Sequence, residues 1–101
     1  MVRHVALFHW KPETTAADVS RVEEALHQLP TRIACIQAYR FGRDLGLQGG
    51  NADFAIVADF VDEEALGLYA NHPDHQSVIT KLIRPITANR AAIQYVIDST
   101  S

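Results

Sequence analysis

Cysteine is nearly absent from this sequence, which limits the chemistry that the chain can carry. Its one cysteine, Cys35, permits no intrachain disulfide and gives no cysteine-based metal site. Positive charge is also sparse, because nine lysines and arginines stand against twelve acidic residues and form no run or stripe. Phosphate contacts need clustered cations, so we expect no nucleic acid partner.

Long hydrophobic runs are missing as well. Only a short apolar stretch separates the N-terminus from Lys11, too short for a signal peptide and far too short to span a bilayer. We therefore expect a cytoplasmic protein with no membrane partner. A hydrophobic content of 48% and a charged content of 21% are typical of globular proteins, and residues 1–101 suffice for a single domain with its own core.

The spacing of apolar residues predicts the order of the elements. Alternation over residues 2–10 indicates a strand. Thr15 and Asp18 resemble a capping box, and apolar residues at helical spacing follow, so a helix is expected from there to Pro30. The remaining chain predicts strands over 33–43, 53–61 and 91–98, with a broken helical region over 62–86.

This β-α-β-β-α-β order predicts an α+β, ferredoxin-like fold, in which helices pack on one face of a four-stranded antiparallel sheet. The uncovered face would expose more apolar surface than a soluble monomer usually shows. The residues concerned are Val5, Leu7, Val57 and Val96. Pairing two such sheets face to face would cover them, so we expect a homodimer.

Histidines concentrate around Pro73, with a tyrosine upstream. Pro73 has no backbone N–H and suits the first turn of a helix, so one helix should end near His72 and another should begin at Pro73. Imidazole titrates near neutral pH. His75 is therefore a candidate general base or acid, but it could instead fix the junction by hydrogen-bonding a backbone carbonyl. The sequence leaves both roles open.

A metal site at the same junction is disfavoured. His72 and His75 could both be ligands, with an oxygen from Asp74. However, Pro73 lies between them, so the two rings need not share a face, and a catalytic zinc site needs three protein ligands. We expect no metal and no cofactor.

Several segments together resemble the stress-responsive A/B barrel domain family, Dabb. They are residues 4–8, 41–43 and 54–60, the segment from Tyr69 to His75, and the C-terminal Arg84-Pro85-Ile86. The resemblance covers essentially the whole chain and implies a dimeric α/β barrel made of two ferredoxin-like sheets. The family includes stress-associated proteins and a few enzymes, such as olivetolic acid cyclase, in which a histidine with a hydrogen-bonded tyrosine acts in an aldol cyclisation.

The resemblance also implies roles for individual residues. His75 matches the catalytic histidine of the cyclase, and Tyr69 matches its hydrogen-bonded tyrosine. His4 matches a further pocket histidine, although a buried histidine with satisfied hydrogen bonds is the alternative. Two other pocket positions, a histidine and a tyrosine in the cyclase, are apolar here, which argues against the same substrate. We expect a ligand to contact His4, Phe54, Leu26 and Phe8.

Two functions therefore remain open. The first is an enzyme, a cyclase or lyase, that uses His75 and Tyr69 for proton transfer on a small hydrophobic, aromatic or polyketide-like compound. The second is a noncatalytic dimeric protein that binds a ligand or acts in a stress response. An apolar cleft with a few converging polar groups would favour the first. A pocket filled by Phe54, Phe8 and Leu26 would favour the second.

Overall fold

The computed structural model of the protein describes residues 1–98, and the expected order of elements is confirmed. A π-helical turn, Ile79–Ile83, and a 3₁₀ turn, Arg84–Ile86, connect the last helix to the last strand. In chain order, the elements are β1 (Val2–Trp10), α1 (Ala16–Arg32), β2 (Ala38–Arg43), β3 (Phe54–Phe60), α2 (Glu63–Ala70), α3 (Pro73–Val78) and β4 (Thr87–Val96).

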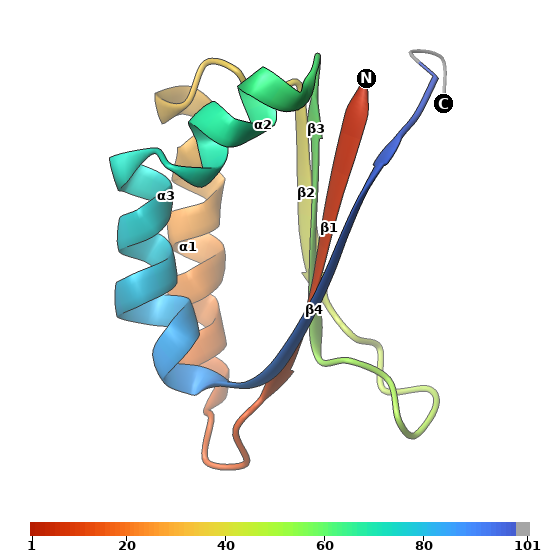
Figure 1. Cartoon of the computed structure of the whole chain (residues 1–101). Helices are drawn as coiled ribbons and strands as arrows, with labels where there is room; N and C mark the ends of the chain where they lie inside the picture. Colours follow the sequence, from red (N-terminus) through yellow and green to blue (C-terminus); the bar gives the residue numbers. More distant parts are fainter. Residues whose placement is uncertain (99–101) are drawn as a thin grey trace.

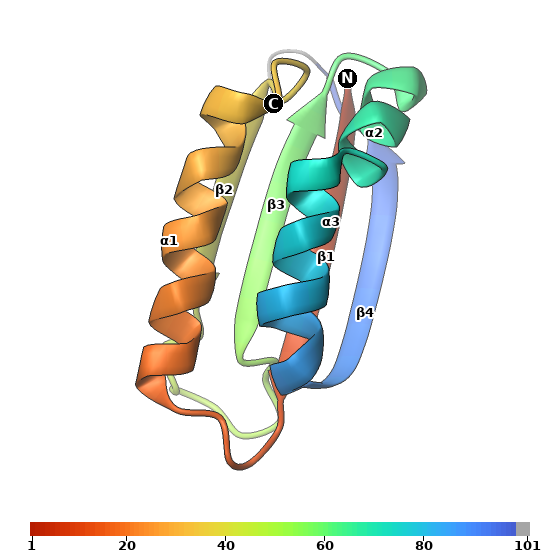
Figure 2. The same ribbon diagram turned by 90° about the vertical axis from the view of Figure 1, so that its left-hand side faces the viewer.

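The four strands form one sheet in the order β2-β3-β1-β4, and each neighbouring pair is antiparallel. All the helices lie on the same face of this sheet, with α1 and α3 side by side (Figures 1 and 2). This is the α+β ferredoxin-like fold that the sequence predicted. No helix within residues 1–98 is long and apolar enough to cross a membrane.

The hydrophobic core lies between the helices and the sheet. Alternate residues of β1 and β3 point toward the helices because side chains alternate between the two faces of a strand. These side chains pack against the apolar face of α1. The capping box expected at Thr15 and Asp18 is present at the start of this helix. The core includes Ala6, Phe8, Phe54, Ile56, Ala58 and Phe60 from the sheet, and Val22, Leu26 and Leu29 from α1.

Two predicted boundaries around the first helix are wrong. The helix does not end at Pro30 but continues to Arg32, because a proline removes only one hydrogen bond and that loss is tolerable in the last turn. The backbone N–H of Ile33 still donates to the carbonyl of Leu29, at 2.8 Å. A turn follows, in which the backbone N–H of Ile36 donates to the carbonyl of Ile33, so the second strand begins at Ala38 rather than at Ile33.

The last strand is longer than predicted. It begins at Thr87 rather than at Ala91, because β4 pairs with β1 along the whole strand as far as Trp10. It ends at Val96 rather than at Asp98, because the pairing with β1 stops at Val2. Asn89 and Arg90 made this stretch too polar to be predicted as strand. Pairing covers only one edge of β4, and its residues from Ala88 onward are exposed.

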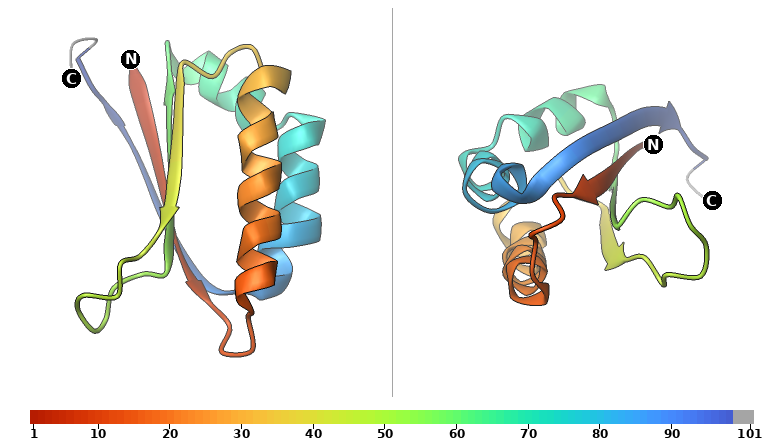
Figure 3. Two further views of the ribbon diagram at one scale, coloured as in Figure 1. Left: turned by 180° about the vertical axis from the view of Figure 1, so that it is seen from behind. Right: turned by 90° about the horizontal axis from the view of Figure 1, so that it is seen from below.

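No helix of residues 1–98 lies on the outer face of the sheet (Figure 3). Leu7 and Val57 lie on it as predicted, but Val96 does not, because it pairs with Val2 and so points to the helix side. The outer face of β4 instead presents Ile93 and Tyr95, which are 59% and 44% exposed, beside Leu7 at 40%. The apolar surface that motivated the dimer is therefore present, with a different contribution from the last strand.

Candidate functional site

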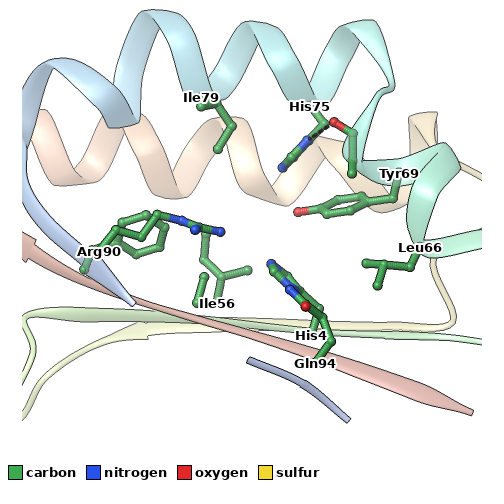
Figure 4. Close-up of a pocket in the computed structure, with 11 residues that line it drawn as sticks. His4, Ile56, Leu66, Tyr69, His75, Ile79, Arg90 and Gln94 are labelled. Carbon is green, nitrogen blue, oxygen red and sulfur yellow. Dashed lines mark hydrogen bonds between the residues drawn. The ribbon is translucent and has the colours of Figure 1, made fainter. Parts of the chain in front are cut away.

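A cavity of about 330 Å³ lies between the sheet and the helices α2 and α3 (Figure 4). Its volume is at the low end of the range for small-molecule pockets, roughly 300–1,000 Å³. Side chains from the sheet form one side of it, and side chains from the two helices form the other. Its apolar lining includes Ala6, Phe8, Ile56, Leu66 and Ile79, and its polar groups are His4, Tyr69, His75, Arg90 and Gln94.

The break between α2 and α3 positions His75, as the sequence predicted. Helix α2 ends at Ala70, and α3 begins at Pro73. His72 caps the new helix, because its Nδ1 accepts a hydrogen bond of 3.1 Å from the backbone N–H of Asp74. The change of direction places His75 in the first turn of α3, where its side chain faces back toward the end of α2.

The hydrogen bonding of His75 fixes which ring nitrogen carries the proton. Its Nδ1 lies 3.1 Å from the carbonyl oxygen of Ala70. A carbonyl can only accept, so Nδ1 is the protonated nitrogen and Nε2 keeps a free lone pair. Figure 4 shows the far end of the ring pointing into the cavity, and no hydrogen bond to Nε2 occurs within residues 1–98.

Burial lowers the pKa of His75 below the ordinary imidazole value, and the positive charge of Arg90 acts in the same direction. The hydrogen bond to Ala70 opposes this effect without reversing it. The lowered pKa favours the neutral ring at neutral pH, where Nε2 can accept a proton.

Tyr69 contacts His75, but not through the expected hydrogen bond. The two rings pack at 4.1 Å between centroids, and the hydroxyl of Tyr69 lies 2.9 Å from the hydroxyl of Tyr39. The two rings pack at a tilt, while Nδ1 of His75 is engaged by Ala70 and the Tyr69 hydroxyl is directed to Tyr39 on β2. Burial raises the pKa of Tyr69 to about 12, so its hydroxyl stays neutral.

His4 faces the same cavity from β1. Its Nδ1 lies 2.7 Å from Nε2 of Gln94, the neighbouring residue on β4. The amide nitrogen donates, so the His4 proton lies on Nε2. Burial lowers the pKa of His4, with a further contribution from Arg90. The cavity thus contains two imidazoles, and their partners give them opposite tautomers.

The four residues expected to contact a ligand separate into two groups. His4 and Phe8 line the cavity beside His75 and Tyr69. Phe54 and Leu26 do not line it, because Phe54 stacks with Phe41 at the start of β3 and Leu26 is buried in the core beneath α1. The core aromatics therefore leave the space around His75 open.

Arg90 and Gln94 were missed by the sequence interpretation. Both lie on β4, opposite Phe8 and His4 of β1, and so point to the helix side of the sheet. Residues 90 and 94 are four positions apart, so their side chains lie on the same face of any strand that contains both, and this spacing could have identified the pair. Starting the strand at Ala91 removed Arg90 from that pattern.

A metal site does not emerge from the described part of the chain. Within residues 1–98, no group of three His, Cys, Asp or Glu side chains is placed to hold an ion. His72 and His75 direct their Nδ1 atoms to different backbone groups, so the two rings do not converge. That the protein needs no metal or cofactor stays a prediction.

Comparison with known proteins identifies relatives of the whole chain. The model of the Stress responsive A/B Barrel Domain family matches residues 2–97. No curated protein matches the sequence. Among solved structures, a dimeric ferredoxin-like protein of unknown function from Thermobifida fusca is 43% identical, with a TM-score of 0.89 over 95% of this chain and 90% of that chain.

More distant structures share the fold. A dimeric protein of unknown function from Bacteroides fragilis is 24% identical, with a TM-score of 0.82 over 95% of each chain. A hydroxynitrile lyase from Passiflora edulis is 15% identical, with a TM-score of 0.83 over 99% of this chain and 95% of that chain. Because the family model spans nearly its full length, this chain belongs to the stress-responsive A/B barrel domain (Dabb) family.

Proposed function

We propose that the protein binds a small, largely apolar compound in the cavity between the sheet and α2–α3, and that Nε2 of His75 exchanges a proton with it. One observation carries this proposal. The hydrogen bond from Nδ1 to Ala70 leaves Nε2 unprotonated, half-buried and directed into a mostly apolar cavity. A base with a lowered pKa in such a site is neutral at the pH at which it must accept a proton.

The surrounding residues suit a reaction that removes a proton from a carbon acid. His4 offers an Nε2–H that can donate to a developing oxyanion on the same ligand. Tyr69 acts as a positioning residue, because its ring packs on the imidazole while its hydroxyl is engaged by Tyr39. Aromatic or polyketide-like substrates of a cyclase or lyase fit this description. The Passiflora hydroxynitrile lyase shows that the same fold can carry an enzyme.

A noncatalytic function is the second candidate, and the same hydrogen bond supports it. The contact between His75 and Ala70 joins the first turn of α3 to the last residue of α2. Gln76 donates to the same carbonyl, at 2.6 Å. His75 would then stabilise the junction, and the cavity would bind a ligand without converting it, for instance in a stress response.

We further propose that the protein is a homodimer in which the outer faces of two sheets meet. The outer face carries apolar residues on three neighbouring strands, β3, β1 and β4. Leu7, Ile93 and Tyr95 are exposed there, and Val5 and Val57 are partly buried. The 43% identical Thermobifida fusca protein is dimeric. A location in the cytoplasm remains the expectation from the sequence.

The proton-transfer proposal can be tested without knowing the substrate. The Kemp elimination of 5-nitrobenzisoxazole reports on a base in an apolar pocket, because the base removes the C3 proton while the N–O bond breaks to give a phenolate. Three variants are compared with the wild type. His75→Ala removes the base, His75→Asn keeps a donor near the Nδ1 position for Ala70 but lacks the base, and His27→Ala removes an exposed histidine of α1 as a control.

We expect the wild type and His27→Ala to accelerate the reaction. Both His75 variants should lose about 10²-fold or more of that acceleration, the typical effect of losing a general base. His75→Asn should remain folded by circular dichroism, which separates loss of the base from loss of the junction. A wild-type rate in His75→Asn, or no acceleration by the wild type, would replace the enzymatic function with the noncatalytic one.

A further inference from the structure

A second cavity, of about 390 Å³, adjoins the first one and differs from it in charge. The two cavities share lining residues, among them Phe8, His75 and Arg90. The second cavity continues toward the turn between α3 and β4, where Arg84 and Thr87 contribute to its lining. His75 therefore lies between an apolar space and a space lined by two arginines.

Within residues 1–98, the two arginines have no carboxylate partner. No Asp or Glu lines either cavity within the described residues, and neither Arg84 nor Arg90 forms an ion pair there. By contrast, Arg3 on the other face of the sheet pairs with Asp59 at 2.8 Å. This lack of acid is notable in a chain of net charge −3. Two arginines that line the same cavity without a carboxylate beside them there form a site that favours an anion.

The position of Arg90 is set by the sheet. It lies opposite Phe8 on β1, and its guanidinium carbon is 6.0 Å from the centroid of the Phe8 ring. That contact orients the charge toward the cavity groups. Figure 4 shows the guanidinium directed toward the space in front of His75 and His4.

We propose that the ligand of this site is an organic carboxylate, whose acid group binds Arg90 and Arg84 while its apolar body enters the space beside Tyr69 and Leu66. This inference rests on the proposed function, since it names the ligand class of the same cavity. A guanidinium binds a planar carboxylate through two parallel hydrogen bonds. The apolar body, placed in this way, passes directly in front of Nε2 of His75.

Calorimetric titration of matched acids and amides tests this proposal. The probes are phenylacetate against phenylacetamide and 3-phenylpropanoate against 3-phenylpropanamide, with inorganic phosphate as a third arm. The variants are Arg90→Gln and Arg84→Gln. Lys81→Gln is the control, because it removes one positive charge from the neighbouring π-helical turn without changing the lining of either cavity.

The acids should bind about tenfold more tightly than their amides, as expected for a charge-assisted contact. Arg90→Gln should abolish this preference, Arg84→Gln should reduce it, and Lys81→Gln should keep it. Added salt should lower the affinity of the protein for the acids but not its affinity for the amides. Equal affinity of acid and amide would overturn the inference and leave the apolar ligand standing, whereas binding of neither would contradict both. Phosphate bound as tightly as the acids would overturn the carboxylate assignment.

Discussion

Two histidines with opposite hydrogen-bonding character face one cavity. His75 donates from Nδ1 to Ala70, and His4 accepts at Nδ1 from Gln94, so one ring presents an acceptor and the other a donor. Such a pair can take a proton from one atom of a ligand and stabilise charge on another. The proposed proton transfer thus depends on two groups that line one cavity, one in a helix junction and one in a strand.

Acid should destabilise the protein through these two histidines. Their folded-state pKa values are lowered mainly by burial, so the unfolded chain binds more protons in the interval just below the ordinary imidazole pKa. The contribution of these two histidines to stability is therefore greatest above about pH 6.5 and decreases as the pH falls from there through the lowered values. Urea unfolding at about pH 7.5 and about pH 5.5 measures the difference. His75→Asn should lose less stability than the wild type over this interval, and an equal loss would contradict the account.

The hydrogen bond between the hydroxyls of Tyr69 and Tyr39 should contribute to the stability of the protein but not to its proton-transfer activity. Tyr69→Phe and Tyr39→Phe each leave one buried hydroxyl without its partner, so each should cost about 1–3 kcal/mol. The double variant should cost less than the sum of the two losses. Tyr69→Phe should retain most of the Kemp activity, because its hydroxyl does not contact His75. Additive losses in urea unfolding, or an activity loss as large as that of His75→Asn, would contradict this geometry.

At the scale of elements, the sequence predicted the helix break at Pro73 because a missing N–H has a fixed structural consequence at the start of a helix. The same residue type misled the interpretation at Pro30, where the helix continues for two more residues. The local sequence does not show whether the backbone N–H groups after the proline still donate hydrogen bonds to carbonyls of the preceding helical turn, as that of Ile33 does to Leu29. The first residues of β4 were missed because polar side chains on an exposed strand give no hydrophobic alternation.

The start of α2 offers a direct test of helix capping near the site. Asp62 accepts a hydrogen bond of 2.9 Å from the backbone N–H of Ala65. Asp62→Ala should cost about 1 kcal/mol of stability, whereas Asp62→Asn should be nearly neutral, because asparagine caps a helix almost as well. Thermal or urea unfolding of both variants measures this difference. An equal loss in the two variants would show that the carboxylate charge, and not the cap, stabilises the helix.

For the molecule as a whole, the sequence predicted the fold, and two of the four residues that it expected beside a ligand line the cavity. The order of elements placed His4 and Phe8 on the helix side of the sheet, near His75. The sequence could not show which apolar residues fill the core and which line the cavity, because an apolar side chain suits both places. Phe54 and Leu26 were therefore assigned to the cavity although they lie in the core. Arg90 and Gln94 enter the site only through the pairing of the first and last strands, a contact between distant parts of the chain.

The proposed dimer should be stable at micromolar concentration. Sedimentation equilibrium should give twice the mass of one chain, with an interface above about 1,000 Å² in total. Ile93→Asp should weaken the dimer strongly, because Ile93 lies directly opposite Val5 on the outer face and would bury a charge there. Leu68→Asp, on an exposed position of α2, is the matched control. A monomeric wild type, or equal effects of the two variants, would argue against this interface.

The proposed function requires Nε2 of His75 to be an unprotonated nitrogen that faces the cavity. Long-range ¹H–¹⁵N correlation spectra of the imidazole rings distinguish the two neutral tautomers directly, and His75→Asn assigns the resonance. We predict that His75 shows the Nδ1-protonated tautomer at neutral pH, and that 3-phenylpropanoate shifts its Nε2 resonance in the wild type. A ring protonated at Nε2, or an Nε2 resonance that no cavity ligand moves, would contradict the account.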